Sequence, residues 1–146
     1  MSEFQQLDIV LVEDSATDAE MTIRVLRKRG LANNLIWLKD GSEALEFLFR
    51  TGAYADRTSG KPKLILLDVK MPKVDGTEVL RRVRDDDALR TTPVVMLTSS
   101  AEECDVLDSY RLGANSYIVK PVNMDDFDKI VSDIGMYWLL VNKAPI

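Results

Sequence analysis

Short apolar runs alternate with longer helical patterns along the whole of this 146-residue chain, and this alternation limits the folds that it can adopt. Runs rich in Val, Ile and Leu are typical of parallel strands that are buried on both faces. Alternation with helices predicts right-handed crossovers and helices on both sides of one sheet. We therefore predict an α/β fold of the flavodoxin-like (βα)5 kind, with a doubly wound parallel sheet and strand order 2-1-3-4-5. The expected strands cover residues 7–13, 34–38, 64–68, 93–98 and 116–119.

Helix start and stop signals delimit the segments between these strands. Ser15 or Thr17 can cap a first helix that ends before Gly30, and a second helix follows Gly41 and ends near Gly52. A third helix follows the turn KMPKVDG. The remaining two helices are expected at about residues 101–112 and 124–141.

Four of the apolar runs stop at polar groups. Ligands bind outside the carboxyl ends of the strands in such sheets, so these groups are expected to share one crevice. They comprise three carboxylates, a hydroxyl and an ammonium, the set needed to transfer a phosphoryl group to a carboxylate beside a divalent cation. The groups belong to Glu13, Asp14, Asp68, Thr98 and Lys120.

The three carboxylates need a cation, because their negative charges would otherwise repel one another. All candidate ligands are hard oxygens, which favours Mg²⁺ or Mn²⁺ over Zn²⁺. Asp68 would act as the nucleophile and form an acyl phosphate. Taken singly, these side chains also fit plainer roles, as helix-end acids, a strand-end Thr98 or a solvated Lys120. Pro121 is expected to fix the chain beside the ammonium, through a cis or a trans bond.

The composition narrows the function further. The chain has no histidine, which excludes histidine-based catalysis and a phosphohistidine of its own, so the donor must be another molecule. A net charge of −5 without a basic stripe argues against nucleic-acid binding. No apolar stretch approaches the roughly 20 residues of a membrane span, and no signal peptide is recognised. We expect a cytoplasmic protein with one domain over residues 1–146, in which Cys104 is a small packing residue.

The combined motif resembles the receiver domain of bacterial two-component response regulators. The resemblance rests on the acid pair Glu13-Asp14, the segment LLDVKMPKVDG around Asp68, the hydroxyl of Thr98 and the dipeptide Lys120-Pro121. It implies that Asp68 accepts a phosphoryl group from the phosphohistidine of a sensor histidine kinase. The protein would then catalyse only its own phosphorylation and slow dephosphorylation, and would signal to a further protein.

The same resemblance assigns roles to the other site residues. It implies that Glu13, Asp14, Asp68 and the backbone carbonyl of Lys70 surround Mg²⁺. It also implies that Thr98 and Tyr117 form a switch pair, in which the hydroxyl moves toward the phosphoryl group and the ring turns inward. Tyr117 fits a plainer role equally well, as a half-buried aromatic residue of a strand.

Two features narrow the resemblance to one group of receivers. We expect no output domain after the last helix, which runs on as IGMYWLLVNKAPI, and a polar loop, AYADRTSGKPK, stands before the third strand. Both are similar to small stand-alone receivers that pair with bacterial phytochrome histidine kinases, notably in cyanobacteria. The loop is expected to be the most mobile part of the chain.

Other function classes fit the residues less well. A phosphatase of the haloacid dehalogenase type needs a second Asp where Lys70 stands. A flavodoxin-like FMN carrier needs a phosphate-binding loop where the two acids follow the first strand. A nucleoside-triphosphate switch needs a GxxxxGK[ST] loop, which is absent. The remaining alternative is an interaction module with the receiver fold that acts without phosphorylation.

The end of the last helix suggests a contact with another chain. Residues 136–141 are apolar on every side, and one sheet cannot cover all sides of a helix. We therefore predict a homodimer with Tyr137 and Trp138 as aromatic anchors, and with Gly135 as a weak point before them. The competing interpretation is that this segment folds back over its own domain.

Overall fold

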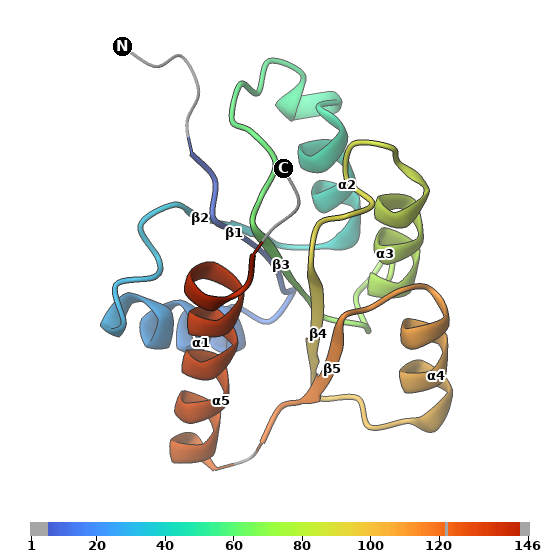
Figure 1. Cartoon of the computed structure of the whole chain (residues 1–146). Helices are drawn as coiled ribbons and strands as arrows, with labels where there is room; N and C mark the ends of the chain where they lie inside the picture. Colours follow the sequence, from blue (N-terminus) through green and yellow to red (C-terminus); the bar gives the residue numbers. More distant parts are fainter. Residues whose placement is uncertain (1–5, 122, 144–146) are drawn as a thin grey trace.

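The computed structural model describes residues 6–121 and 123–143, which form a parallel sheet with helices on both faces (Figure 1). The sheet has the order β2-β1-β3-β4-β5, so the predicted fold and strand order are confirmed. Every strand except β5 is shorter than predicted. The strands are β1 (Ile9–Val12), β2 (Leu35–Leu38), β3 (Leu64–Leu67), β4 (Val94–Thr98) and β5 (Ser116–Val119).

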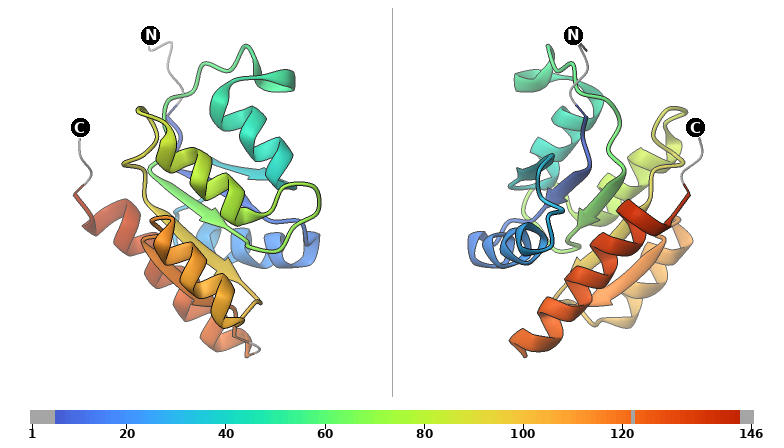
Figure 2. Two further views of the ribbon diagram at one scale, coloured as in Figure 1. Left: turned by 90° about the vertical axis from the view of Figure 1, so that its right-hand side faces the viewer. Right: turned by 60° about the vertical axis from the view of Figure 1, so that its left-hand side comes forward.

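Five α-helices cover the sheet, with α1 packing beside α5 on one face and α3 lying between α2 and α4 on the other (Figure 2). They are α1 (Ala16–Lys28), α2 (Gly41–Phe49), α3 (Gly76–Asp85), α4 (Glu103–Arg111) and α5 (Met124–Met136). Ser15, and not Thr17, caps α1 by accepting a hydrogen bond from the N–H of Asp18. Within the described ranges, no helix combines the length and the hydropathy that crossing a bilayer would require.

The central strands are buried on both faces, which explains their uninterrupted apolar sequences. Alternate residues of β1 and β3 point to opposite sides of the sheet. Val10 and Leu67 join the cluster under α2 and α3, whereas Leu11 and Leu66 join the cluster under α1 and α5. The core therefore consists of two layers, and the sheet lies between them.

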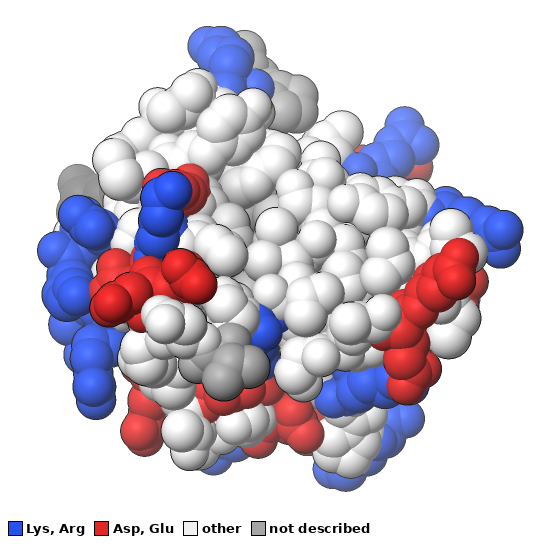
Figure 3. Space-filling view, turned by 90° about the horizontal axis from the view of Figure 1, so that it is seen from below, with Lys and Arg blue, Asp and Glu red and all other residues white. Residues whose placement is uncertain are grey.

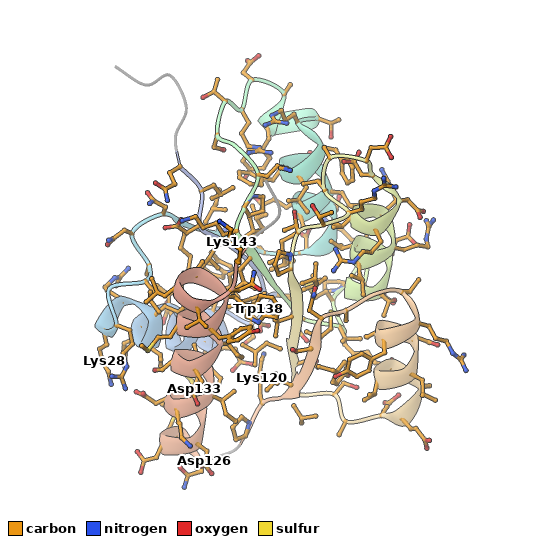
Figure 4. The ribbon with its side chains drawn as sticks, in the orientation of Figure 1. Lys28, Lys120, Asp126, Asp133, Trp138 and Lys143 are labelled. Atoms are coloured by element: carbon orange, nitrogen blue, oxygen red, sulfur yellow. The ribbon has the colours of Figure 1, made fainter. Side chains whose placement is uncertain are left out.

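The last helix differs from the prediction at its end. Its α-helical part stops at Met136, and a π-helical turn follows at Tyr137–Val141. Trp138 and Leu139 pack against the core of their own domain, so part of the predicted apolar tail does fold back. Figure 4 shows Trp138 between α5 and the strands. Tyr137, Leu140 and Val141 remain exposed.

Gly135 has a packing role that the sequence did not reveal. A Cβ atom at this position would lie 2.7 Å from Cδ2 of Leu26 and 2.9 Å from Cδ1 of Leu31. The glycine therefore allows α5 to lie close against α1 and the turn that follows it. The prediction that Gly135 weakens the helix before Tyr137 stays a prediction, and this packing role stands beside it.

The polar loop before β3 is held by hydrogen bonds. Arg57 donates to the carbonyls of Phe47, Ser59 and Gly60, and its guanidinium lies 4.2 Å from the centre of the Phe47 ring. These contacts fasten the loop to the end of α2. A short 3₁₀ turn at Gly52–Tyr54 includes the first two residues of the loop.

Cys104 is exposed, so its predicted role as a packing residue is wrong. Its helix, α4, buries only Ser109. The reason is that α4 lies at the edge of the structure beside β5, where one narrow face is covered and the rest meets solvent.

Candidate functional site

The predicted site residues meet at one edge of the sheet, because the carboxyl ends of parallel strands lie together. Glu13 and Asp14 follow β1, Asp68 follows β3, and Thr98 ends β4. Lys120 follows β5 and lies near the lower end of the sheet in Figure 4. All five polar groups that the sequence singled out are therefore brought to this edge.

The acidic side chains form one cluster. Glu13, Asp14 and Asp68 each offer a carboxylate oxygen, and these oxygens lie within 4.8 Å of one another. Glu13 is 3% exposed and Asp68 is 7% exposed, whereas Asp14 faces solvent. Asp14 is thus the member through which an ion from solution would first reach the cluster. Clustered hard oxygen donors fit Mg²⁺ or Mn²⁺.

The electrostatics of the cluster show that it needs a compensating positive charge. The pKa of Glu13 is raised to about 7: burial is the largest cause, the ammonium of Lys120 lowers the pKa, and the nearby carboxylate of Asp68 raises it. A buried carboxyl group with a raised pKa takes up a proton or a cation more readily than an exposed one.

Lys120 supplies positive charge from within the chain. Its side chain is only 8% exposed, and its ammonium contacts Glu13, lies 2.9 Å from Oδ2 of Asp18 and lies 3.9 Å from Oδ2 of Asp68. Burial lowers the pKa of Lys120, but the hydrogen bonds to Glu13 and Asp18 and the nearby acids raise it above its ordinary value. The lysine therefore stays charged beside Asp68.

The backbone fixes the position of Asp68. Its N–H donates to the carbonyl of Val12 at 3.0 Å, and its Oδ1 accepts from the N–H of Val69 at 2.8 Å. The other carboxylate oxygen is the one that faces Lys120. The turn after Asp68 closes through the N–H of Gly76, which donates to the carbonyl of Val69 at 2.7 Å.

Thr98 and Tyr117 are linked through Ser100. The Thr98 hydroxyl oxygen is buried and accepts from the N–H of Ser100 at 3.2 Å. The Tyr117 hydroxyl donates to the carbonyl of the same serine at 2.9 Å. Burial raises the pKa of Tyr117, so this hydroxyl stays protonated as a donor at neutral pH. A movement of Thr98 would therefore be transmitted to Tyr117 through Ser100.

Two predicted residues have more limited support. The Lys70 side chain lies 3.6 Å from Glu102 and from Asp105, and the role of its backbone carbonyl as a metal ligand stays a prediction. The described part of the chain contains no cis peptide bond, so the bond between Lys120 and Pro121 is trans. The N–H of Lys120 donates to the carbonyl of Thr98 at 2.7 Å, which fixes the lysine backbone at the sheet edge.

Sequence reasoning missed two residues of the site. Asp18 contacts Lys120, and the available signal was its position in the first turn of α1, four residues after Asp14. The indole N–H of Trp37 donates to the carbonyl of Glu13 at 2.8 Å and so supports the acid pair from β2. No local pattern in the sequence indicated this contact.

A second hollow lies away from this site. It has a volume of about 710 Å³ and lies over the start of β2, between Asn34 and Ser59. Its lining includes Arg57, which the loop carbonyls already engage. The hollow contains neither the clustered acids nor Lys120, so the candidate site is the cluster at the carboxyl edge of the sheet.

Comparisons with known proteins agree with this geometry. The family model described as "Response regulator receiver domain" matches residues 9–132. The response regulator Rcp1 of Synechocystis sp. (strain ATCC 27184 / PCC 6803 / Kazusa) is 43% identical over 137 residues, which cover 94% of this chain and 92% of Rcp1. The structure of the Mn²⁺-bound form of Rcp1 has a TM-score of 0.87 at 41% identity, covering 96% of this chain and 99% of that one.

Two further solved structures are similar over most of the chain. The phosphorylated cyanobacterial phytochrome response regulator RcpA has a TM-score of 0.89 at 36% identity, covering 97% of this chain and 100% of that one. The bacteriophytochrome response regulator AtBRR has a TM-score of 0.73 at 48% identity, with the same coverage of both chains.

Proposed function

Since the chain belongs to the response regulator receiver domain family, we propose that it is a phosphorylation-activated signalling switch in which Asp68 accepts a phosphoryl group from a sensor histidine kinase. This proposal rests on the groups that surround Asp68. A nearly buried carboxylate faces two further carboxylates and a buried ammonium. That arrangement combines a nucleophile, a cation site and a positive charge for the phosphoryl oxygens.

In the proposed reaction, a carboxylate oxygen of Asp68 forms a bond to phosphorus. The bond between phosphorus and the leaving group breaks, and the leaving group keeps the electron pair. With the kinase, the leaving group is the histidine nitrogen, and with acetyl phosphate it is acetate. The product is an acyl phosphate on Asp68, to which Lys120 and Thr98 offer an ammonium and a hydroxyl.

Glu13, Asp14 and Asp68 would hold the divalent cation, and we propose Mg²⁺, with Mn²⁺ as a substitute. When bound, the cation neutralises charge that develops on the transferring phosphoryl group. The clustered oxygens and the raised pKa of Glu13 support this assignment. The Mn²⁺-bound form of the similar protein Rcp1 supports it as well.

We expect phosphorylation to require a divalent cation. Acetyl phosphate with Mg²⁺ should increase the intact mass by one phosphoryl group, and excess EDTA should abolish the gain. Asp14→Ala should weaken the affinity for Mg²⁺ by about tenfold or more, because even changes behind the direct ligands commonly cost that much. Asp87→Ala, which removes an exposed acid elsewhere, should bind Mg²⁺ as the unmodified protein does. Labelling at full rate in EDTA would contradict the metal role.

The proposed kinase partner belongs to the phytochrome class. Two similar structures, RcpA and AtBRR, are named as phytochrome or bacteriophytochrome response regulators. We further propose that the protein works in the cytoplasm and passes its signal to another protein. The net charge of −5 supports a protein partner over nucleic acid. Phosphoryl transfer from a purified phytochrome kinase to the wild-type chain, and not to Asp68→Asn, tests the partner.

The competing function is an interaction module that acts without phosphorylation. The intact set of Asp68, Thr98 and Lys120 favours the switch. We propose that phosphorylation changes the surface around α4, β5 and α5. Tyr117 belongs to β5, and its hydroxyl donates a hydrogen bond to the carbonyl of Ser100. A partner that binds the phosphorylated and unmodified protein equally well would favour the interaction module.

We also propose that the chain forms a homodimer through this surface. Figure 3 shows a broad area without charged side chains across the middle of the view from below. An exposed patch of apolar side chains commonly marks a protein contact. Among the residues that the structure describes, the exposed large apolar ones all come from α4, β5, α5 and the final turn, and they are Leu107, Tyr110, Val119, Met124, Met136, Tyr137, Leu140 and Val141.

Sedimentation velocity tests the dimer. Wild-type protein at micromolar concentration should sediment as a dimer, and Tyr137→Ser/Leu140→Ser should shift it toward the monomer. Trp138→Ser serves as a comparison, because Trp138 packs on its own core and its loss should lower the melting temperature. A wild-type protein that stays monomeric with and without acetyl phosphate would contradict the dimer.

A further inference from the structure

Lys120 is held more closely by two other acids than by Asp68. Its ammonium has three N–H donors, contacts Glu13 and lies 2.9 Å from Asp18, but it lies 3.9 Å from Asp68. The last distance is too long for a hydrogen bond. The positive charge expected at the phosphoryl group is therefore drawn toward the side of α1 in this structure.

The position of Asp18 is fixed by its own helix. Its backbone N–H donates to Ser15 Oγ at 3.2 Å, and its carbonyl accepts from Thr22 Oγ1 at 3.0 Å. The main chain is thus anchored at the start of α1, and only the side chain reaches across to Lys120. An acid in the first turn of a helix also interacts favourably with the helix dipole, but that effect does not require a partner on another element.

We propose that Asp18 is a positioning residue that holds Lys120 on the α1 side of the site before phosphorylation and releases it when Asp68 carries a phosphoryl group. A phosphoryl group brings about 1.5 to 2 negative charges and three acceptor oxygens, which compete with Asp18 for the ammonium. The release connects the chemistry at Asp68 to the start of α1. This inference rests on the proposed function and adds a means of regulating it.

The first test removes the charge of Asp18. Asp18→Asn removes one of the two acids that hold Lys120 away from Asp68, so labelling by acetyl phosphate at saturating Mg²⁺ should become about threefold to tenfold faster. Glu20→Gln is the matched control, since Glu20 is an exposed acid of the same helix without an ion pair among the described residues. It should label at the wild-type rate. A rate for Asp18→Asn that is unchanged or lower would overturn the proposal.

The second test asks whether Asp18 acts through Lys120. In the background Lys120→Met, which removes the ammonium at similar length, Asp18→Asn should change the labelling rate less than twofold. A purely local effect on α1 would persist in that background. Equal rate changes with and without Lys120 would therefore overturn the positioning role.

A third measurement does not depend on phosphorylation. The indole of Trp37 bonds to the carbonyl of Glu13, so its fluorescence reports Mg²⁺ binding once Trp138→Phe has removed the other tryptophan. Asp18→Asn should weaken the Mg²⁺ affinity about threefold, because the freed ammonium competes for Glu13 and Asp68. This change should disappear in Lys120→Met, and its persistence there would count against the proposal. Absent labelling of wild-type protein would instead refute the proposed function, while this Mg²⁺ measurement still decides the role of Asp18.

Discussion

Asp68→Asn protein is expected to show no gain of mass with acetyl phosphate and Mg²⁺ under conditions that fully label the wild-type protein. The substitution keeps the shape of the side chain but replaces the anionic nucleophile with an amide. The hydrogen bond from Val69 can be retained, since the amide oxygen is also an acceptor. The fold should therefore remain, and only the acceptor chemistry should be lost. Intact-mass spectrometry measures the result directly.

The control for this experiment is Asp87→Asn, which changes an exposed aspartate in the segment after α3. It should label as the wild-type protein does. Circular dichroism of both variants checks that each one is folded. If Asp68→Asn gained as much mass as the wild-type protein, the acceptor would have to be another residue, and the assignment of the site would fail.

Gly76→Ala should cause the second large effect, this time on the geometry of the site. A Cβ atom at position 76 would overlap the backbone carbonyl of Asp68 and crowd the Cα of Val69. These are backbone atoms and cannot move aside as a flexible side chain can. We expect a loss of stability of about 2 to 3 kcal/mol, as for other overpacked positions, together with much slower labelling. Urea denaturation and the acetyl phosphate assay measure the two effects.

Gly60→Ala is the matched control. A Cβ at position 60 would meet no heavy atom within 4 Å, so this exchange should leave labelling unchanged and stability within about 0.5 kcal/mol. If Gly76→Ala behaved like Gly60→Ala, the turn after Asp68 would be more adaptable than its packing indicates. The close approach of position 76 to Asp68 would then not be what holds the acceptor in place.

The sequence alone determined the fold and five polar residues that the carboxyl edge of the sheet brings together. Four of the five strands carry an apolar run with one of these polar groups at its end, and parallel strands bring such ends to one edge. Asp68 and Lys120 are 52 residues apart, as their numbers show, yet their positions after β3 and β5 place them together. This information is local to each strand, so it can be read without knowing any distance.

Only the tertiary structure decided how these groups pair. The sequence placed Lys120 with Asp68, but the structure brings it closer to Asp18, on a helix that the strand pattern does not orient. The structure also places Trp138 on the core and Cys104 in solvent. It explains the glycine at position 135 by the close approach of the Leu26 and Leu31 side chains. Each of these outcomes depends on contacts between elements distant in the chain. The periodicity of the sequence determines which face of a helix or strand is buried. Which side chains contact one another depends on distances of a few ångströms across the packed interior.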